Sequence, residues 1–155
     1  MAKRRVMTKA DVDDFMSQKT LAIVGASRNW LKFGNMAYRQ LKDKGYRVFP
    51  VNPNADTVEG DRCYPSLSAL PERPGGAVIV VHPRATEQVV RDAAAAGIQR
   101  VWMQQGSYSE DAARFCEQNG IRFVHGHCVL MFAEPAAFYH RFHSWLWKLI
   151  GRLPQ

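Results

Sequence analysis

The sequence Leu21-Ala-Ile-Val-Gly25-Ala-Ser27-Arg28 decides the fold of this chain. A short apolar run, residues 21–24, ends in a glycine and a small polar residue, and a loop to Gly34 leads into a helical pattern. This order predicts a strand, a turn and a helix whose N-terminus faces the turn. Backbone N–H groups and the helix dipole attract anions at such a place, so the stretch predicts a phosphate-binding loop.

The rest of the chain alternates between the patterns of strands and helices. Further strands are predicted at residues 47–51, 77–81, 100–103 and 121–124. Helices are predicted at residues 34–44 and 109–119, and an Ala-rich helix is predicted to follow residues 82–84 and to run to residue 96. A capping-box pattern from Thr8 to Asp11 indicates an extra N-terminal helix before the first strand. Residues 56–74 are irregular, with room for one helical turn at 66–70. The alternation predicts an α/β fold with a Rossmann-like, doubly wound parallel five-stranded sheet in the order 2-1-3-4-5.

The C-terminal segment departs from this alternation. Large aromatic side chains recur at helical spacing over residues 138–150, as at Phe138, Phe142 and Trp145. We therefore predict an aromatic amphipathic helix in a C-terminal extension over about residues 135–150. Three interpretations remain open: the helix docks on the protein's own sheet, it forms a homodimer or another protein contact through residues 136–150, or it lies on a membrane surface.

Length and composition indicate a single globular domain over residues 1–155, with a core at about 20–128. The sequence lacks the roughly 18 unbroken apolar residues of a membrane span and has no secretory signal pattern. Its three cysteines have no metal-type spacing, so we expect free thiols and a cytoplasmic location. The net charge is +7, but much of the excess lies at the chain ends, and we expect no nucleic-acid partner.

The first loop can be tested against known nucleotide sites. The NAD fingerprint requires glycines at positions that here hold Gly25, Ser27 and Trp30, so one of three matches. It also requires an acid after the second strand, where this chain has Asn52. The usual NAD site is therefore disfavoured, while NADP stays open because Arg28 could meet its additional phosphate. A receiver-type phosphorylation domain fails as well, because it needs an acid where His82 stands.

An anionic nucleotide fits the first loop better. Ser27 supplies a donor, Arg28 and Lys32 supply cations, and Gly34 allows close approach to the backbone. These features suit a ligand with several phosphates.

Several longer motifs carry a family resemblance. They are Val24-Gly-Ala-Ser27, Gly45-Tyr-Arg-Val-Phe-Pro-Val-Asn-Pro53, Cys63-Tyr-Pro-Ser-Leu67 and Val101-Trp-Met-Gln104 followed by Gly106. Over residues 21–128 the chain resembles the CoA-binding protein family, which is similar to the CoA-binding domain of the succinyl-CoA synthetase α subunit. The resemblance implies a stand-alone Rossmann-type domain that binds coenzyme A and has no established reaction.

The resemblance also implies where coenzyme A would bind. The loop at 25–34 would meet its phosphates, the loop after the second strand would flank the nucleotide, and the two remaining loops would line the pantetheine path. The predicted cofactor-binding residues are Gly25, Ala26, Ser27, Arg28, Lys32, Gly34, Asn52, Pro53, Asn54, Val81, His82, Pro83, Arg84, Gln104, Gln105 and Gly106. This chain departs from many relatives at Lys32, where they have Arg, and at Gly34, where they have Ser.

Few residues suggest chemistry. Cys128 lies close to His125 and His127, and three interpretations stay open: a structural loop, a reactive thiol or a metal ligand set. We predict no catalytic residue and no ligase activity, because nothing in the chain supplies a ligase's nucleotide-triphosphate machinery.

We therefore predict a module that binds coenzyme A or an acyl-CoA, as a carrier, a sensor or a unit that delivers it to a partner, without catalysis of its own. Two alternatives are an NADP-dependent oxidoreductase and an interaction protein that docks through its aromatic C-terminal helix.

Overall fold

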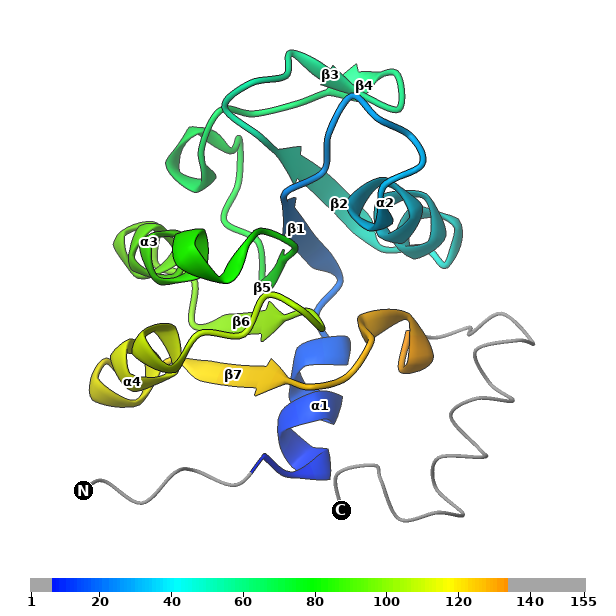
Figure 1. Cartoon of the computed structure of the whole chain (residues 1–155). Helices are drawn as coiled ribbons and strands as arrows, with labels where there is room; N and C mark the ends of the chain where they lie inside the picture. The colour runs from blue at the N-terminus through cyan, green and yellow to red at the C-terminus, as the bar shows by residue number, and fades with distance from the viewer. Residues whose placement is uncertain (1–6, 134–155) are drawn as a thin grey trace.

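Five parallel strands form the sheet at the centre of the computed structural model, which describes residues 7–133 (Figure 1). They are β1 (Thr20–Val24), β2 (Arg47–Val51), β5 (Gly76–Ile79), β6 (Arg100–Met103) and β7 (Arg122–His125). Their order is β2-β1-β5-β6-β7. Among these five strands that order is the predicted 2-1-3-4-5, because β3 and β4 belong to a separate hairpin. The prediction of a Rossmann-like parallel sheet is confirmed.

Helices cover both faces of the sheet. One face carries α1 (Lys9–Met16), α2 (Phe33–Asp43) and the short 3₁₀ helix η2 (Val129–Met131). The other carries α3 (Pro83–Ala95), α4 (Glu110–Gln118) and the 3₁₀ helix η1 (Leu67–Ala69). Successive side chains of a strand point to opposite faces, so Leu21 and Ile23 join the first layer while Ala22 and Val24 join the second.

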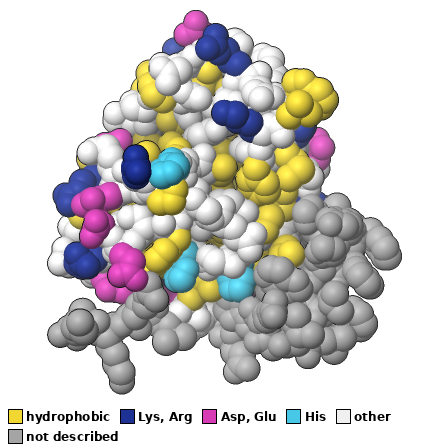
Figure 2. Space-filling model, viewed as in Figure 1, with side chains coloured by type: hydrophobic (Ala, Val, Ile, Leu, Met, Phe, Trp, Pro, Cys, Tyr) yellow, Lys and Arg dark blue, Asp and Glu magenta, His cyan; other side chains and the backbone are white. Residues whose placement is uncertain are grey.

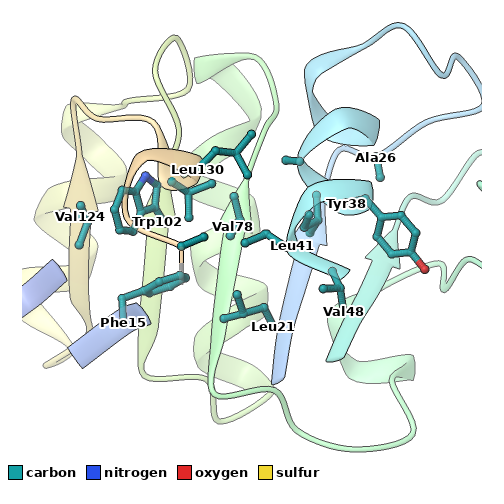
Figure 3. Packing of buried hydrophobic residues seen from close by; sticks show 14 of the residues in the cluster. Phe15, Leu21, Ala26, Tyr38, Leu41, Val48, Val78, Trp102, Val124 and Leu130 are labelled. Carbon is teal, nitrogen blue, oxygen red and sulfur yellow. The ribbon is translucent and has the colours of Figure 1, made fainter. Parts of the chain in front are cut away.

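Trp102 of β6 lies in the core near Phe15 of α1 and Leu130 of η2 (Figure 3). Its side chain is fully buried, and its ring packs edge-on against Phe15 of α1 with 5.4 Å between centroids. The indole N–H of Trp102 donates to the His127 carbonyl at 3.0 Å. This satisfies its polar group and ties the segment after β7 to the sheet.

The N-terminal helix is confirmed with its capping box: the Thr8 hydroxyl accepts the Asp11 N–H, and the Thr8 N–H donates to Asp11 Oδ2. Sequence reasoning missed the hairpin of β3 (Thr57–Val58) and β4 (Asp61–Arg62) within the stretch expected to be irregular. The strand predicted at 77–81 runs from Gly76 to Ile79, because the chain leaves the ladder where the Val80 carbonyl lies against Gly25.

The outer edge of β2 is partly covered. The Tyr64 N–H donates to the Pro50 carbonyl at 3.0 Å, and the Asn52 N–H donates to the Tyr64 carbonyl at 2.9 Å.

Two further observations concern the ends of the chain and membranes. The predicted C-terminal helical extension over about 135–150 lies outside the described residues. Within residues 7–133, no helix has both the length and the apolar character needed to cross a bilayer.

Candidate functional site

The carboxyl ends of three strands meet at Gly25, which follows β1. Its φ is +112°, and its N–H donates to the Val51 carbonyl of β2 at 3.1 Å. A Cβ atom added at Gly25 would lie 2.0 Å from the Val80 carbonyl oxygen, just beyond β5. Only glycine allows the end of β1 to approach the end of β5 this closely. The contact lies at the point of the sheet where the strand order reverses.

Helix α2 points its N-terminus at this turn. Its N-cap is Lys32, whose side chain makes no capping hydrogen bond within the described part of the chain. Gly34, in the first turn of α2, packs closely on the β1 turn, since an added Cβ would lie 3.0 Å from the Gly25 carbonyl oxygen. The first N–H groups of α2 are therefore placed to receive an anion.

Two cations flank this helix N-terminus. Arg28 and Lys32 are exposed, and neither has an ion-pair partner among residues 7–133. Figure 2 shows basic side chains in the upper part of this face, above a band of hydrophobic side chains. Trp30 and Leu31, between the two cations, are 64% and 72% exposed. The loop thus presents positive charge and apolar surface that the described residues leave uncovered.

Two asparagines hold the backbone of this loop. The Asn35 side chain is 1% exposed; its Oδ1 accepts the Ser27 N–H at 2.8 Å and its Nδ2 donates to the Ser27 carbonyl at 2.6 Å. The Asn52 Nδ2 donates to the Ala26 carbonyl at 2.9 Å, and its Oδ1 accepts the Asn54 N–H at 2.8 Å. The Asn52 amide, predicted to flank the nucleotide, therefore joins the two loops.

A set of contacts that joins the first loop, α2 and the turn between β3 and β4 was not predicted from the sequence. Glu59 Oε1, in the turn between β3 and β4, accepts from Arg39 Nη1 at 2.6 Å and from Asn35 Nδ2 at 3.1 Å. Arg39 Nη1 also donates to the Trp30 carbonyl at 3.1 Å. The only signal in the sequence was the position of Asn35 and Arg39 on the predicted helix at 34–44.

The loop after β5 lies beside Gly25. An added Cβ at Gly25 would lie 3.3 Å from Val81 Cγ1, so predicted site residues from the first and third loops come together. His82 is the N-cap of α3, and its Nδ1 accepts the Arg84 N–H at 3.2 Å, with Pro83 next in the helix. The Arg84 side chain is exposed. His82 thus shapes the strand end and orients the start of α3.

The predicted site residues after β6 serve packing as well. The Gln104 side chain is buried, and its Oε1 accepts the Val129 N–H of η2 at 3.1 Å. Gln105 Nε2 donates to the Gly126 carbonyl at 3.4 Å, and Gly106 takes a positive φ of 85° in the turn. Gln104 therefore fixes η2 on the end of the sheet.

The segment around Cys128 contains partly buried side chains and packs through aromatic contacts. The His125 ring packs against Tyr108, with 4.4 Å between centroids. Burial lowers the pKa of His127 below its usual value, and the neighbouring His125 lowers it further. Cys128 is half-buried. Residues 7–133 contain no group of three or more His, Cys, Asp or Glu side chains placed to hold a metal, so these neighbours do not form a ligand set there.

Comparisons with known proteins agree with this geometry. Residues 19–134 match the family model of the CoA binding domain. The chain is 32% identical over 117 residues to the ADP-forming acetate–CoA ligase II of Archaeoglobus fulgidus, covering 74% of this chain and 17% of that relative. It therefore spans less than a fifth of the ligase's length.

Two solved structures are similar over nearly their whole length. A conserved hypothetical protein from Pyrococcus furiosus has a TM-score of 0.68 and 40% identity, over 72% of this chain and 96% of that one. A hypothetical protein from Pyrococcus horikoshii has a TM-score of 0.79 and 29% identity, over 88% and 99%. The family model matches most of the chain, and the parallel sheet with its turn at Gly25 agrees with that match. This chain therefore belongs to the CoA-binding domain family.

Proposed function

We propose that this chain binds coenzyme A or an acyl-CoA at the carboxyl ends of its parallel strands, without catalysis of its own. The observation that carries the proposal is the uncapped N-terminus of α2, which faces the turn at Gly25 with Arg28 and Lys32 unpaired beside it among the described residues. Coenzyme A carries a pyrophosphate and a 3′-phosphate, so it suits a helix N-terminus with nearby cations.

The rest of the ligand would follow the edge of the sheet. In this proposal the loop at 52–54 flanks the nucleotide, and the loops at 81–84 and 104–106 line the path of the pantetheine arm. Asn52, His82 and Gln104 would act mainly by holding these loops, since their side chains already bond to the protein.

We propose only the binding step for this chain. This chain covers only 17% of the similar ligase, so the ligase's activity is not part of the proposal. In this proposal the chain, as one domain over residues 1–155, acts in the cytoplasm as a carrier, a sensor or a delivery module for coenzyme A. Delivery or dimerisation through residues 136–150 is part of the same proposal.

Calorimetry with coenzyme A, dephospho-CoA and NADPH tests the proposal. We expect coenzyme A to bind, and dephospho-CoA to bind more weakly because it lacks the 3′-phosphate. Tighter binding of NADPH than of coenzyme A would favour the oxidoreductase alternative. No heat of binding with any of the three would refute the proposal and favour an interaction protein.

A further inference from the structure

The turn between β3 and β4 places a glutamate where the backbone disfavours one. Glu59 and Gly60 have φ values of +52° and +80°, the pattern of a tight hairpin turn in which asparagine and glycine are usual. Glu59 is the one non-glycine residue with positive φ among residues 7–133. A residue in a disfavoured backbone conformation persists only where contacts with its surroundings stabilise it.

The Glu59 carboxylate is bonded to two side chains that contact the first loop, Asn35 and Arg39. Its Oε1 accepts from Asn35 Nδ2, and Asn35 fixes the N–H and the carbonyl of Ser27. The same Oε1 accepts from Arg39 Nη1, which also donates to the Trp30 carbonyl. The Glu59 side chain is 19% exposed and that of Arg39 is 38% exposed, so this ion pair lies at the protein surface.

The hairpin itself is fastened to α2. Asp61, two residues after Glu59, pairs with Lys42 at 2.6 Å and accepts a hydrogen bond from the Tyr38 hydroxyl. The hairpin is therefore held against α2, and Figure 1 shows it near the loop between β1 and α2.

We propose that Glu59 is a positioning residue for the ligand loop. By orienting Asn35 and Arg39, it fixes the backbone at Ser27 and Trp30, and Arg28 lies between them with its side chain free for the ligand. Glu59 touches no ligand; it lowers the cost of ordering the loop when the ligand binds. This inference rests on the proposed binding of coenzyme A.

The negative charge of Glu59 allows two roles with opposite effects on ligand affinity to be distinguished. A bare carboxylate near an anion site would repel the ligand, and its removal would then strengthen binding. A positioning carboxylate, neutralised by Arg39, has the opposite effect when removed.

The test replaces Glu59 without harming the turn. Asparagine favours positive φ, and its side chain is one methylene shorter, so Glu59→Asn keeps the hairpin but withdraws the carboxylate from Asn35 and Arg39. Glu59→Gln retains an acceptor oxygen at full length and serves as the conservative rescue. Glu72→Ala is the matched control, because it removes a carboxylate paired with Arg47 at the opposite end of β2.

Two measurements are made on the full chain: coenzyme A affinity by calorimetry, and amide hydrogen exchange of residues 26–32 without ligand. We expect Glu59→Asn to weaken affinity by about 10-fold and to speed exchange in this segment, at an unchanged or higher unfolding temperature. For Glu59→Gln, we expect an affinity and an exchange rate between those of Glu59→Asn and the wild type. For Glu72→Ala, we expect both to match the wild type.

Affinity and exchange both unchanged in Glu59→Asn, or affinity increased, would overturn the inference. Absence of coenzyme A binding by the wild type would instead overturn the proposed function. The exchange rates alone would then decide whether Glu59 positions the loop: faster exchange in Glu59→Asn supports it, and equal rates refute it.

Discussion

Replacing Gly25 by alanine should be among the most damaging single changes near the site. The new Cβ would lie 2.0 Å from the Val80 carbonyl oxygen and 2.7 Å from the Val80 carbonyl carbon. Both are backbone atoms, so no side chain can move aside to relieve the overlap. The ends of β1 and β5 would have to separate.

The magnitude follows from two contributions. An alanine at a φ of +112° costs about 1–3 kcal/mol in backbone strain. Separating the ends of β1 and β5 weakens the hydrogen bond from the Val80 N–H to the Val24 carbonyl, which contributes about 1 kcal/mol. We expect a loss of about 2–4 kcal/mol, a substantial part of the about 5–15 kcal/mol by which a typical domain is stable.

Gly45→Ala is the matched control. Gly45 has a φ of +95°, but a Cβ added there meets nothing within 4 Å, so this variant carries the strain without the clash. Urea unfolding followed by circular dichroism gives both free energies, and we expect Gly45→Ala to lose about 1–3 kcal/mol. Equal losses in the two variants would refute the reasoning, because they would show that the contact with Val80 has no energetic consequence.

Two other predictions concern binding and pH. Arg28→Ala and Lys32→Ala should each weaken coenzyme A binding by about 1–3 kcal/mol in calorimetry with unchanged unfolding free energy, because both side chains are exposed; unchanged affinity in both variants contradicts the phosphate assignment. The pKa of His127 is lowered in the folded state, so the unfolded state takes up the proton first as the pH falls. Unfolding free energy should therefore decrease below about pH 6.5. His127→Gln should show less of this decrease, and an equal slope in both proteins would contradict it.

Much of the fold was predictable because local signals agree with the tertiary structure. The Thr8 and Asp11 pair marks the start of α1 in the sequence and forms both bonds of a capping box. The apolar runs of β1 and β6 are buried on both faces, as expected of strands inside a parallel sheet. With short strand–helix connections, the handedness of the crossovers then restricts the strand order to very few choices.

The hairpin of β3 and β4 was not predictable in the same way. Each strand has two residues, which is too short for any alternation to appear. The turn residue Glu59 is also unusual for its conformation, so the usual Asn-Gly or Asp-Gly signal is missing. Tertiary contacts with α2 select this hairpin instead.

The meeting of the loops at Gly25 was predictable, but the contacts that support the first loop were not. The meeting of the loops at Gly25 follows from topology, which the sequence pattern reveals. The roles of Asn35 and Arg39 depend on which turn of α2 faces which part of the loop, and a hydrophobic pattern carries no such information. Likewise, nothing in the sequence distinguishes Gln104 as a buried partner of η2 from a residue that lines the ligand path.

The covered edge of β2 has a consequence for self-association. Pro50 has no N–H to offer a further strand, and its carbonyl is already bonded to Tyr64. Where its pairing groups are removed or occupied, as at Pro50, a sheet edge is a poor template for another chain, so this part of the edge is protected from outward growth.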